Sequence, residues 1–398
     1  MSEESKIKVL NLVRWYPNRI DPMPGLFIQR HIEASAIYCS PGVVYTHQIE
    51  GEWNIKKNYD VQVSMINNVP TAKIYYKSSR SLLLPYRKLI NIIRFFRANK
   101  IGIKAIKAEL EGIDLIHVHI LTRLGIIAMY HKVFKGRQYI VTEHWSRYLD
   151  LTGDFKGAFR KLVTKIVVKN AAAVTAVTKN LASAMQKHAL KNNNYTVLPN
   201  VVDNIFLNSK PDKAGKSKKV NFIHVSCFED KSKNVSGLLR VIKELSLERD
   251  DFFFTMVGDG MDFKAMKDYA KKLKIREGII KWKGLLEGKP LVKEMQVADM
   301  LVIFSNYENF PVVINESLCL GVPVIATRVG GIPERINKSN GILINAGDEK
   351  ALLGSLRKFI DRKISFNMVG ISNKNRLEFS PKGVGNQLYI LYKEALAK

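Results

Sequence analysis

The sequence predicts an α/β protein on the basis of two patterns. Short runs of β-branched and apolar residues recur between stretches of helical periodicity, and within each run the hydrophobic residues are continuous rather than alternating. Strands of this kind are buried on both faces, which is typical of parallel sheets covered by helices. In chain order the predicted strands are KVLNLV, DLIHVHI, QYIVTEH, AAVTAVT, VNFIHVS, FFFTMVG, MLVIFS and PVIAT.

The length of 398 residues suffices for two domains, each with its own core. The polar segment NSKPDKAGKSKK, which follows NVVDNIFL, has the Lys, Ser, Gly and Pro content typical of a linker between domains. We therefore expect one domain over residues 1–208 and a second over residues 209–378, followed by a C-terminal helix over residues 379–398.

The composition constrains the compartment and the partners. No apolar run reaches the ~20 residues that a membrane span needs, and the N-terminus lacks the pattern of a signal peptide, so we expect a cytoplasmic protein. The three cysteines lie far apart and predict reduced thiols rather than a disulfide framework. The formal net charge of +27 predicts attraction to nucleic acid, a membrane surface or a phosphorylated substrate.

Ligands of open α/β sheets bind at the carboxyl ends of strands, so the loops after the predicted strands are candidate sites. A Pro-rich loop after the first strand ends in Gly25, before a helix expected to begin near Leu26. Gly25 would let the backbone approach a ligand closely, or would serve the turn alone. His144 follows a later strand and could donate to a hydroxyl or phosphate of a substrate; a structural role is equally open.

The motif IHVHI places His117 and His119 on one face of a strand, a spacing that metal ligands use. No Cys or third His lies near them in the sequence to complete a site. We therefore expect no metal site.

Two loops of the second half contain residues suited to phosphate. Lys231 and Lys233 precede a predicted helix, where an ammonium and backbone amides can converge on an anion, or where lysines can simply be solvated. The loop GDGMD begins with Gly258, which fits either a close approach to a ligand or a tight turn.

Residues 305–334, SNYENFPVVINESLCLGVPVIATRVGGIPE, carry two glutamates around a junction between a loop and a helix. MLVIFS predicts a strand, NYENFP its loop, and VVINESLCLG a helix that ends at Gly321. Glu308 then lies in the loop and Glu316 in the first turns of the helix. The helix dipole alone would explain Glu316 but not Glu308.

The amides of Phe310, Val312 and Val313 at this helix start are available to a diphosphate, whereas Pro311 has no N–H to offer. A carboxylate beside an anion site needs neutral donors, and sugar hydroxyls are such donors. We therefore expect a nucleotide sugar, with its ribose at Glu316 and its transferred sugar at Glu308.

The run ENFPVVINESLCLGVPVIATRVGGIPE closely resembles the signature of the family 4 retaining glycosyltransferases. Further matches span nearly the whole chain: the Gly25 loop, DLIHVH, TEH, TAVTKNL, VLPNVVDNIF, KN at 233–234, VGDG, KWKG and ADMLVIFS. The opening WYPN…PGLFIQRH and HVSCFEDKSKN are similar to the bacterial surface-polysaccharide branch, with capsule and lipopolysaccharide synthesis among its roles. The resemblance implies the GT-B fold of two Rossmann-like domains facing a central cleft, with the C-terminal helix packing back on the N-terminal domain.

By position, the resemblance assigns roles to individual residues. Glu316 would hold the ribose, Glu308 the donor sugar, the amides from Phe310 to Val313 the diphosphate, and His144 the donor sugar or the acceptor side. The implied donor site comprises Gly25, Lys231, Lys233, Asn234, Gly258, Glu308, Asn309, Phe310, Pro311, Val312, Val313 and Glu316, with His144 and Glu308 as the catalytic residues. The donor is expected to be a UDP-sugar rather than a GDP-sugar, and the acceptor a glycan or lipid-linked sugar.

One departure from the family pattern concerns phosphate binding. Where the family has Gly-Arg-Leu followed by a Lys, this chain has Ser226, Cys227 and Phe228, so the phosphate-binding Arg is missing. Lys231 is a candidate replacement for its charge.

The residues predict a reaction without metal or cofactor. No Asp-x-Asp pair is present to chelate a divalent ion, and amides with Lys can stabilise the departing diphosphate. The family outcome is retention, and no carboxylate is clearly placed as a covalent nucleophile. Same-face attack, with the departing phosphate helping to deprotonate the acceptor, is therefore favoured.

The segment from Lys73 to Lys107 carries ten basic residues and no acid, interleaved with LLLPY and LINIIRFF. Such a segment predicts peripheral binding to the inner face of the cell membrane, although an ordinary helix with a solvated face would share the pattern.

Two other functions compete with glycosyl transfer. A nucleotide-sugar epimerase shares the fold, and a basic nucleic-acid- or membrane-binding protein would explain the charge but not the glutamate loop. No nucleic-acid signature is present, so we expect no nucleic-acid partner.

Overall fold

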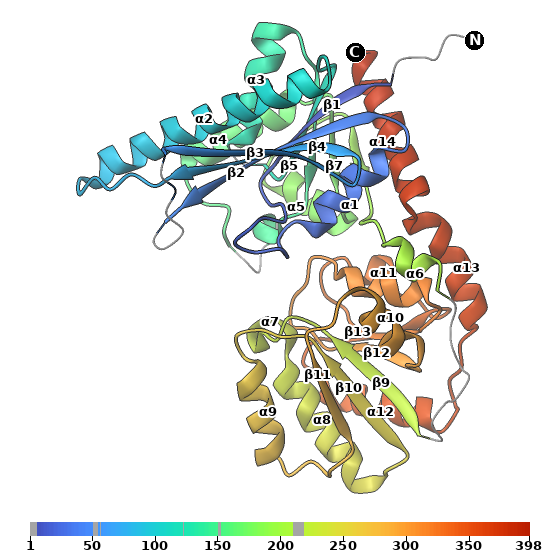
Figure 1. Cartoon of the computed structure of the whole chain (residues 1–398). Coiled ribbons are helices and arrows are strands. Elements are labelled where there is room, and N and C mark those ends of the chain that lie inside the picture. Colours follow the sequence, from blue (N-terminus) through green and yellow to red (C-terminus); the bar gives the residue numbers. More distant parts are fainter. Residues whose placement is uncertain (1–5, 51–54, 56, 122, 150–152, 210–218) are drawn as a thin grey trace. The chain divides into compact units, whose positions relative to one another are not determined.

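The computed structural model describes residues 6–50, 55, 57–121, 123–149, 153–209 and 219–398. They form two compact units, each built around a β-sheet (Figure 1). Unit 1 contains residues 1–177, 182–201 and 381–398, and unit 2 contains residues 178–181 and 202–380. Residues 210–218, the middle of the predicted linker, lie outside the described residues.

Unit 1 has an eight-stranded sheet in the order β3-β4-β2-β1-β5-β6-β7-β8. Its strands are β1 (Lys8–Val13), β2 (Ser40–Ile49), β3 (Tyr59–Ile66), β4 (Val69–Lys77), β5 (Leu115–His119), β6 (Tyr139–Glu143), β7 (Ala173–Ala176) and β8 (Tyr195–Val197). Its helices are α1 (Leu26–Ser35), α2 (Leu84–Glu109), α3 (Leu124–Lys135), α4 (Ala158–Asn170) and α14 (Pro381–Leu396), with a 3-10 turn η1 (Ser146–Tyr148). Helix α5 (Lys179–Lys187) begins in unit 2 and continues into unit 1.

The α/β class is confirmed, and all eight predicted strands are present. The expectation of purely parallel sheets is wrong at one edge, because β3 pairs antiparallel with β4. Asn67 and Asn68 connect these two strands, and both have positive φ, 48° and 63°. A two-residue turn of this kind matches the twist of an antiparallel hairpin, and Asn tolerates the left-handed region. The hairpin therefore follows from the Asn-Asn pair.

Helix α14 packs against α1 although 346 residues separate the end of α1 at Ser35 from the start of α14 at Pro381. An ideal Cβ on Gly385 would lie only 2.2 Å from the carbonyl oxygen of Ala34, so this close helix contact requires glycine. Val384, Leu388 and Tyr392 complete a buried cluster with strand residues of unit 1. The C-terminal helix is thus part of the core of unit 1.

Unit 2 has a six-stranded parallel sheet in the order β11-β10-β9-β12-β13-β14. Its strands are β9 (Val220–Val225), β10 (Phe252–Val257), β11 (Ile280–Gly284), β12 (Met300–Ile303), β13 (Val324–Thr327) and β14 (Gly341–Ile344). Its helices are α6 (Asn204–Leu207), α7 (Asp230–Lys233), α8 (Val235–Glu248), α9 (Phe263–Lys272), α10 (Gly288–Gln296), α11 (Val312–Cys319), α12 (Glu349–Ile360) and α13 (Met368–Phe379), with a 3-10 turn η2 (Ile332–Glu334).

Two hydrophobic clusters cover the two faces of the unit 2 sheet. Phe222 and Phe254 pack with α8, α9 and α12 on one face. Ile223 and Leu301 pack with α6, α10, α11 and α13 on the other. Because neighbouring strand residues point to opposite faces, both faces must be apolar, which is why these strands read as continuous hydrophobic runs.

Each sheet has a point where the strand order reverses direction. In unit 2 the chain leaves β9 toward β10 and β11, then returns to the other side of β9 with β12. In unit 1 the corresponding neighbours are β1 and β5. Loops diverge at such a switch point, and open α/β sheets bind ligands there, beyond the carboxyl ends of the strands.

Among the helices of the described residues, none combines the length and hydrophobicity needed to cross a bilayer.

Candidate active site

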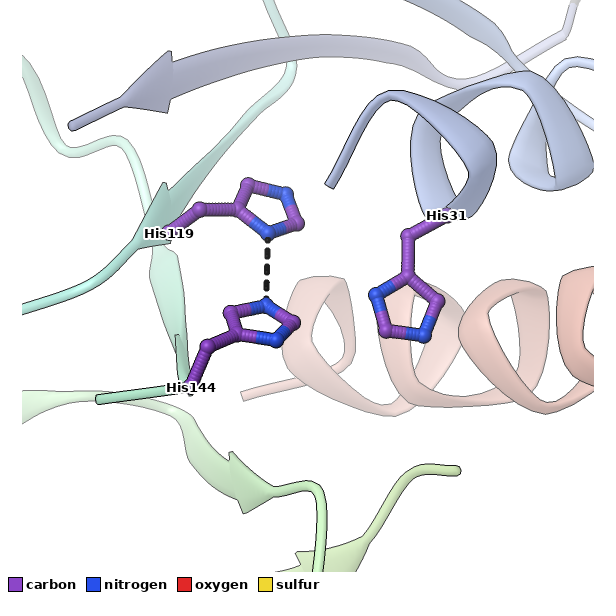
Figure 2. A group of neighbouring side chains, drawn as sticks. All are labelled: His31, His119 and His144. Carbon is purple, nitrogen blue, oxygen red and sulfur yellow. Dashed lines mark hydrogen bonds between the residues drawn. The ribbon is translucent and has the colours of Figure 1, made fainter. Parts of the chain in front are cut away.

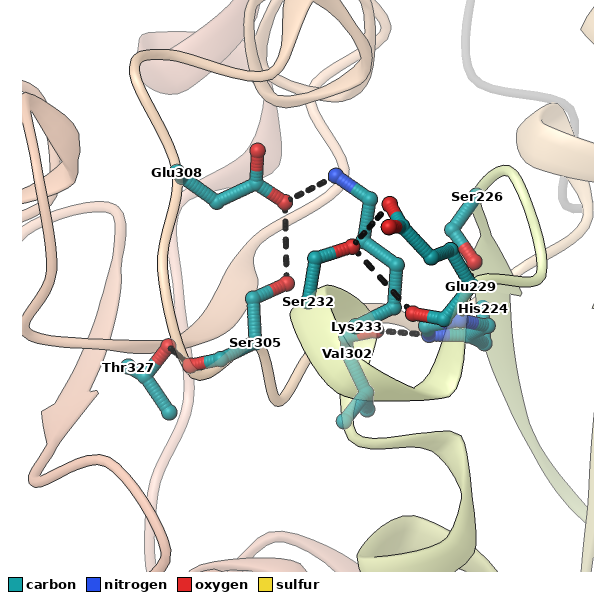
Figure 3. Close-up of polar contacts among 9 residues, drawn as sticks. All are labelled: His224, Ser226, Glu229, Ser232, Lys233, Val302, Ser305, Glu308 and Thr327. Atoms are coloured by element: carbon teal, nitrogen blue, oxygen red, sulfur yellow. Dashed lines mark hydrogen bonds and ion pairs between the residues drawn. The ribbon is translucent and has the colours of Figure 1, made fainter. Parts of the chain in front are cut away.

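The switch point of unit 2 brings Lys233 and Glu308 together. Lys233 ends α7, which follows β9, and Glu308 lies in the loop after β12. The Lys233 Nζ lies 2.6 Å from Glu308 Oε1, and the Ser305 hydroxyl donates to the same oxygen at 2.9 Å (Figure 3). Glu308 therefore lies in a loop, as predicted, and its carboxylate accepts from Lys233 of α7 and from Ser305 of its own loop.

This ion pair is largely shielded from water. The side chains of Lys233 and Glu308 are 16% and 9% exposed. Burial on its own would lower the pKa of Lys233, but the charge and hydrogen bond of Glu308 outweigh it, so the pKa is raised above its ordinary value. Lys233 thus stays charged, and each partner offsets the desolvation of the other.

A second polar chain supports the same loops. The Nδ1–H of His224 donates to the Val302 carbonyl at 2.9 Å, which leaves Nε2 to accept from the Ser226 hydroxyl at 2.7 Å. Burial lowers the pKa of His224 to about 4, so the ring is neutral near pH 7. The Thr327 hydroxyl donates to the Ser305 carbonyl at 2.7 Å from the neighbouring strand (Figure 3). His224 therefore links Ser226, directly after β9, to strand β12, and Thr327 links the loop after β12 to strand β13.

Two glycines pack closely against the backbone of the loop that contains Glu308. Gly330 has φ +54°, and a Cβ there would lie 2.0 Å from the Glu308 carbonyl oxygen. The Gly331 N–H donates to the Asn309 carbonyl at 2.7 Å. The Gly-Gly pair of the RVGGIPE motif therefore serves close packing under residues 308 and 309, and larger residues would displace Glu308.

Gly258 plays a comparable part under the loop after β9. Its φ is +132°, and a Cβ there would overlap the Ser226 carbonyl oxygen at 1.8 Å. Asn234 also has a left-handed backbone, with φ 50°, at the junction of α7 and α8. Lys231 lies in α7 and is exposed; its carbonyl accepts from the Asn306 side chain at 3.1 Å. The local backbone therefore explains why Gly258 and Asn234 occupy these positions. Their contacts with a donor stay predictions.

Helix α11 begins at Val312 after Pro311 and contains Glu316, as the sequence predicts. Glu316 is 7% exposed, although it is a charged residue. The Phe310 side chain packs in the core cluster of this face, so its predicted part in diphosphate binding concerns its amide alone. The first amides of a helix have no intrahelical acceptor and face an anion at its N-terminus.

In unit 1, His144 follows β6 directly, as expected. The preceding Glu143 is buried, and its carboxylate accepts from the N–H groups of Leu121, His144 and Trp145 at 2.8–3.0 Å. Burial raises the pKa of Glu143 to about 7 in spite of those three donors. The carboxylate thereby fixes the backbone on both sides of His144.

Gly25 caps α1 with φ +82°, and a Cβ there would come within 2.4 Å of the Trp15 carbonyl group. The close approach predicted for Gly25 is therefore made to the Trp15 backbone, and contact with a donor stays a prediction.

Ile120, directly after β5, has φ 71°, which is rare for a β-branched residue. Such strain costs ~1–3 kcal/mol and is found at functional sites.

Three histidines from separate elements meet near these loops. His31 of α1, His119 of β5 and His144 are all buried, and one ring nitrogen of each lies within 4.8 Å of the others (Figure 2). The sequence offered no third histidine near His117 and His119, because His31 and His144 join the group only through the fold. His117 itself bonds with the Tyr392 and Thr142 hydroxyls at 2.9 and 2.6 Å.

Sequence reasoning did not single out Ser305, Glu143 or His31. Ser305 and Glu143 do stand at the carboxyl ends of predicted strands, which is the signal that could have found them. His31 lies inside a helix, where no local pattern distinguishes it from a surface residue.

Comparisons with known proteins agree with this architecture. Residues 207–376 match the family model described as glycosyl transferases group 1, and residues 56–204 match that described as glycosyltransferase family 4. A protein of Methanocaldococcus jannaschii named as an uncharacterized glycosyltransferase is 27% identical over 330 residues, covering 82% of this chain and 87% of that protein.

Two solved structures are similar over nearly their full length. A sucrose-phosphate synthase from Thermosynechococcus elongatus has a TM-score of 0.72 at 17% identity, covering 98% of this chain and 99% of that one. An Anabaena protein crystallised in complex with UDP has a TM-score of 0.69 at 16% identity, covering 97% of this chain and 100% of that one. At these identities the likeness concerns the fold.

Proposed function

Because this chain belongs to the family 4 glycosyltransferases and has their GT-B fold, we propose that it moves a sugar from a UDP-sugar to a glycan or lipid-linked acceptor, with retention. The product would enter polysaccharide or glycoconjugate synthesis. The observation that carries the proposal is the Lys233–Glu308 pair at the switch point of unit 2. The Anabaena structure with UDP supports the choice of base.

The pair suits a ligand with both phosphate and hydroxyl groups. Both described contacts of the Glu308 carboxylate fall on Oε1, and we assign Oε2 to a hydroxyl of the donor sugar. Lys233 stays charged beside Glu308 and supplies a cation to the diphosphate. In the absence of a donor, Glu308 balances the charge of Lys233, so the buried cation is not left unpaired.

The start of α11 supplies the remaining donor contacts. The amides from Phe310 to Val313 would bind the diphosphate, with Pro311 setting the entry into the helix. Glu316, five residues into α11, would accept from the ribose hydroxyls. Asn234, Asn309, Gly258 and Lys231 complete the proposed donor site around this core.

The proposed chemistry needs no covalent enzyme intermediate. The bond between the anomeric carbon and the leaving phosphate oxygen breaks while the acceptor oxygen attacks from the same face, and the acceptor proton passes to the departing phosphate. Lys233 and the helix amides stabilise the charge on the leaving diphosphate. We assign His144 to the donor sugar or the acceptor; burial holds its pKa well below the ordinary value, so the ring is neutral. We expect no resident cofactor or metal in this step.

We further propose that unit 1 binds an anionic membrane surface peripherally, on the cytoplasmic side, through the start of α2. Leu82 and Leu83 are 97% and 71% exposed just before α2, and Leu84, Leu89 and Ile93 are exposed within it. Basic residues surround them, and Arg87, Lys88 and Arg97 are exposed too. Exposed apolar side chains among cations are the pattern of a surface-bound helix. Phe95, which lies in the same basic segment, is buried in the core and therefore cannot contribute to the membrane-binding face.

The test is incubation of the full chain with a panel of UDP- and GDP-sugars and a lipid-linked glycan fraction. Transfer predicts diphosphate release together with a labelled acceptor. An epimerase would instead interconvert the donor sugar without labelling the acceptor, and a protein that only binds nucleic acid or membrane would do neither. Thermal stabilisation by one nucleotide identifies the base independently of the acceptor.

A further inference from the structure

We infer that His31, His119 and His144 form a binding site for one transition-metal ion, with Zn²⁺ as the chemical fit. The three side chains come from α1, β5 and the loop after β6, and Figure 2 shows their rings turned toward a common centre. His119 Nδ1 lies 3.5 Å from His144 Nε2. Nitrogens bound to one zinc at ~2.0–2.1 Å lie about 3.4 Å apart, so this pair already has ligand spacing.

Hydrogen bonds decide which nitrogen of two rings carries the lone pair. His31 Nε2 lies 2.8 Å from the Pro199 carbonyl oxygen, which only accepts, so Nε2 carries the proton. The Asn11 amide donates to the Val9 and Gly42 carbonyls, which leaves its Oδ1 to accept from His119 Nε2 at 3.2 Å.

Both rings therefore present an unprotonated Nδ1 to the centre of the group. His31 Nδ1 is buried and has no hydrogen-bond partner among the described residues. A ligating histidine whose other N–H is bound to a carbonyl or amide oxygen is the usual outer-shell arrangement of protein metal sites. An unpartnered buried nitrogen is costly unless something binds it.

The protonation state and the surroundings favour the same ligand. All three rings are buried, and burial favours the uncharged imidazole over the charged form. Metal ligation requires neutral imidazole. The Phe27 ring lies 4.9 Å from His144 and gives the group an apolar wall. Imidazole nitrogens suit Zn²⁺, whereas Mg²⁺ prefers oxygen.

His117 shows why only these three rings qualify among its neighbours. Its ring centroid lies 3.9 Å from that of His119, but hydroxyl groups engage both of its nitrogens. The predicted pair in IHVHI is thus divided: His119 faces the group and His117 is held in the core. Zinc would also occupy His144, so bound zinc should slow transfer; this last step rests on the proposed function.

The experiment titrates the full chain, freed of metal by a chelator, with Zn²⁺ against a chromophoric competitor. We expect one zinc per chain, and at least tenfold weaker binding in His31→Gln and in His119→Gln. His131→Gln is the matched control, because His131 is also buried in unit 1 but lies outside the group, and its affinity should equal that of the wild type.

Failure of the wild type to bind one zinc, or unchanged affinity in both variants, overturns the site. Crystals of the wild type soaked in zinc test the site even where a variant does not fold. We expect an anomalous peak within bonding distance of His31 and His119, and the absence of such a peak would contradict the proposed site. If zinc binds there and transfer proceeds at full rate, the site stands and the role given to His144 in the proposed function falls.

Discussion

Lys233 and Glu308, 75 residues apart, form a 2.6 Å ion pair that joins helix α7, which follows β9, to the loop after β12. The pair exists because β12 returns to the side of β9 that β10 does not occupy. Breaking a buried pair leaves an uncompensated charge, which costs far more than the pair contributes in the intact protein. The same two side chains thus hold the loops together and offer the donor a cation and a carboxylate.

Lys233→Gln should lower both stability and donor affinity. The uncompensated Glu308 carboxylate predicts a loss of ~2–4 kcal/mol in the free energy of unfolding, measured by urea denaturation. Loss of the cation predicts at least about tenfold weaker binding of UDP, measured by calorimetry. The control is Lys283→Gln, which breaks the more exposed Lys283–Glu294 pair and should cost under ~1 kcal/mol. Equal effects of the two substitutions would contradict the importance of the buried pair.

Glu316→Ala should weaken donor binding about tenfold or more. A hydrogen bond to a buried carboxylate is worth ~1.5–3 kcal/mol, and Glu316 is the carboxylate that we assign to the ribose. Calorimetry with UDP and with uridine diphosphate sugars would measure the change in a variant whose circular dichroism is native. Glu294→Ala serves as the control on the neighbouring α10. An unchanged dissociation constant in folded Glu316→Ala would remove the ribose assignment.

The parts of the fold that the sequence predicts are those with a local signal. The eight predicted strands are buried on both faces and read as apolar runs, and α1 and α11 begin where the Gly25 and Pro311 loops end. The sequence did not predict β2, β3, β4, β8, β11 and β14. In β3, residues 61–65 are exposed on both faces and are mixed in polarity, so they lack the apolar run of a buried strand. The hairpin of β3 and β4 depends on Asn67 and Asn68, a turn signal that outweighs the weak strand pattern.

The candidate site was predictable residue by residue but not as a set of contacts. Lys233 and Glu308 were each expected near phosphate or sugar, yet their ion pair depends on the strand order β9-β12, which no local pattern reveals. His31 joins His119 and His144 because α1 packs beside the end of β5, a contact between residues 88 positions apart along the sequence. Tertiary contacts of this range are where sequence reasoning ends.

Transfer should proceed in excess EDTA at nearly the rate seen in Mg²⁺. Lys233 and the first amides of α11 are the groups that we assign to the leaving diphosphate, and they act without a chelated ion. Initial rates with matched ionic strength would measure this. Complete loss of turnover in EDTA that Mg²⁺ or Mn²⁺ restores would show a divalent ion at the diphosphate and would contradict the proposed chemistry.

Stability should fall as the pH is lowered from about 6.5 toward 4, in part through His224. Its pKa is lowered to about 4 by burial, so below pH 6.5 the unfolded chain binds a proton that the folded chain does not. Stability from this group is therefore present above pH 6.5 and lost on acidification. Between pH 7 and 5 the wild type should lose about 2 kcal/mol more than His224→Gln, measured by urea denaturation. Identical pH slopes, or an NMR titration of His224 near its ordinary midpoint, would contradict this.

The last prediction concerns the exposed start of α2, which should bind anionic vesicles. Leu82 and Leu83 offer apolar area that contributes ~25 cal/mol per Å² once buried in the lipid interface, and each basic residue near the surface adds ~1 kcal/mol. Replacing Arg87, Lys88 and Arg97 with Gln should reduce co-sedimentation with vesicles, while UDP binding by unit 2 stays intact. Arg94 is left unchanged because its guanidinium donates to the Lys77 carbonyl at 2.8 Å and supports the fold.

The matched control replaces three exposed lysines of unit 2 by Gln and removes the same net charge from a different surface. These lysines are Lys264, Lys271 and Lys272 of α9. If attraction to lipid is local to α2, the control should bind vesicles as the wild type does, and binding of both should weaken as the screening length shortens from ~10 Å at 0.1 M salt to ~3 Å at 1 M. Equal losses in the two triple variants would mean that the net charge of +27 acts as a whole, and wild-type protein that ignores anionic vesicles at low salt would leave the α2 segment an ordinary solvated face.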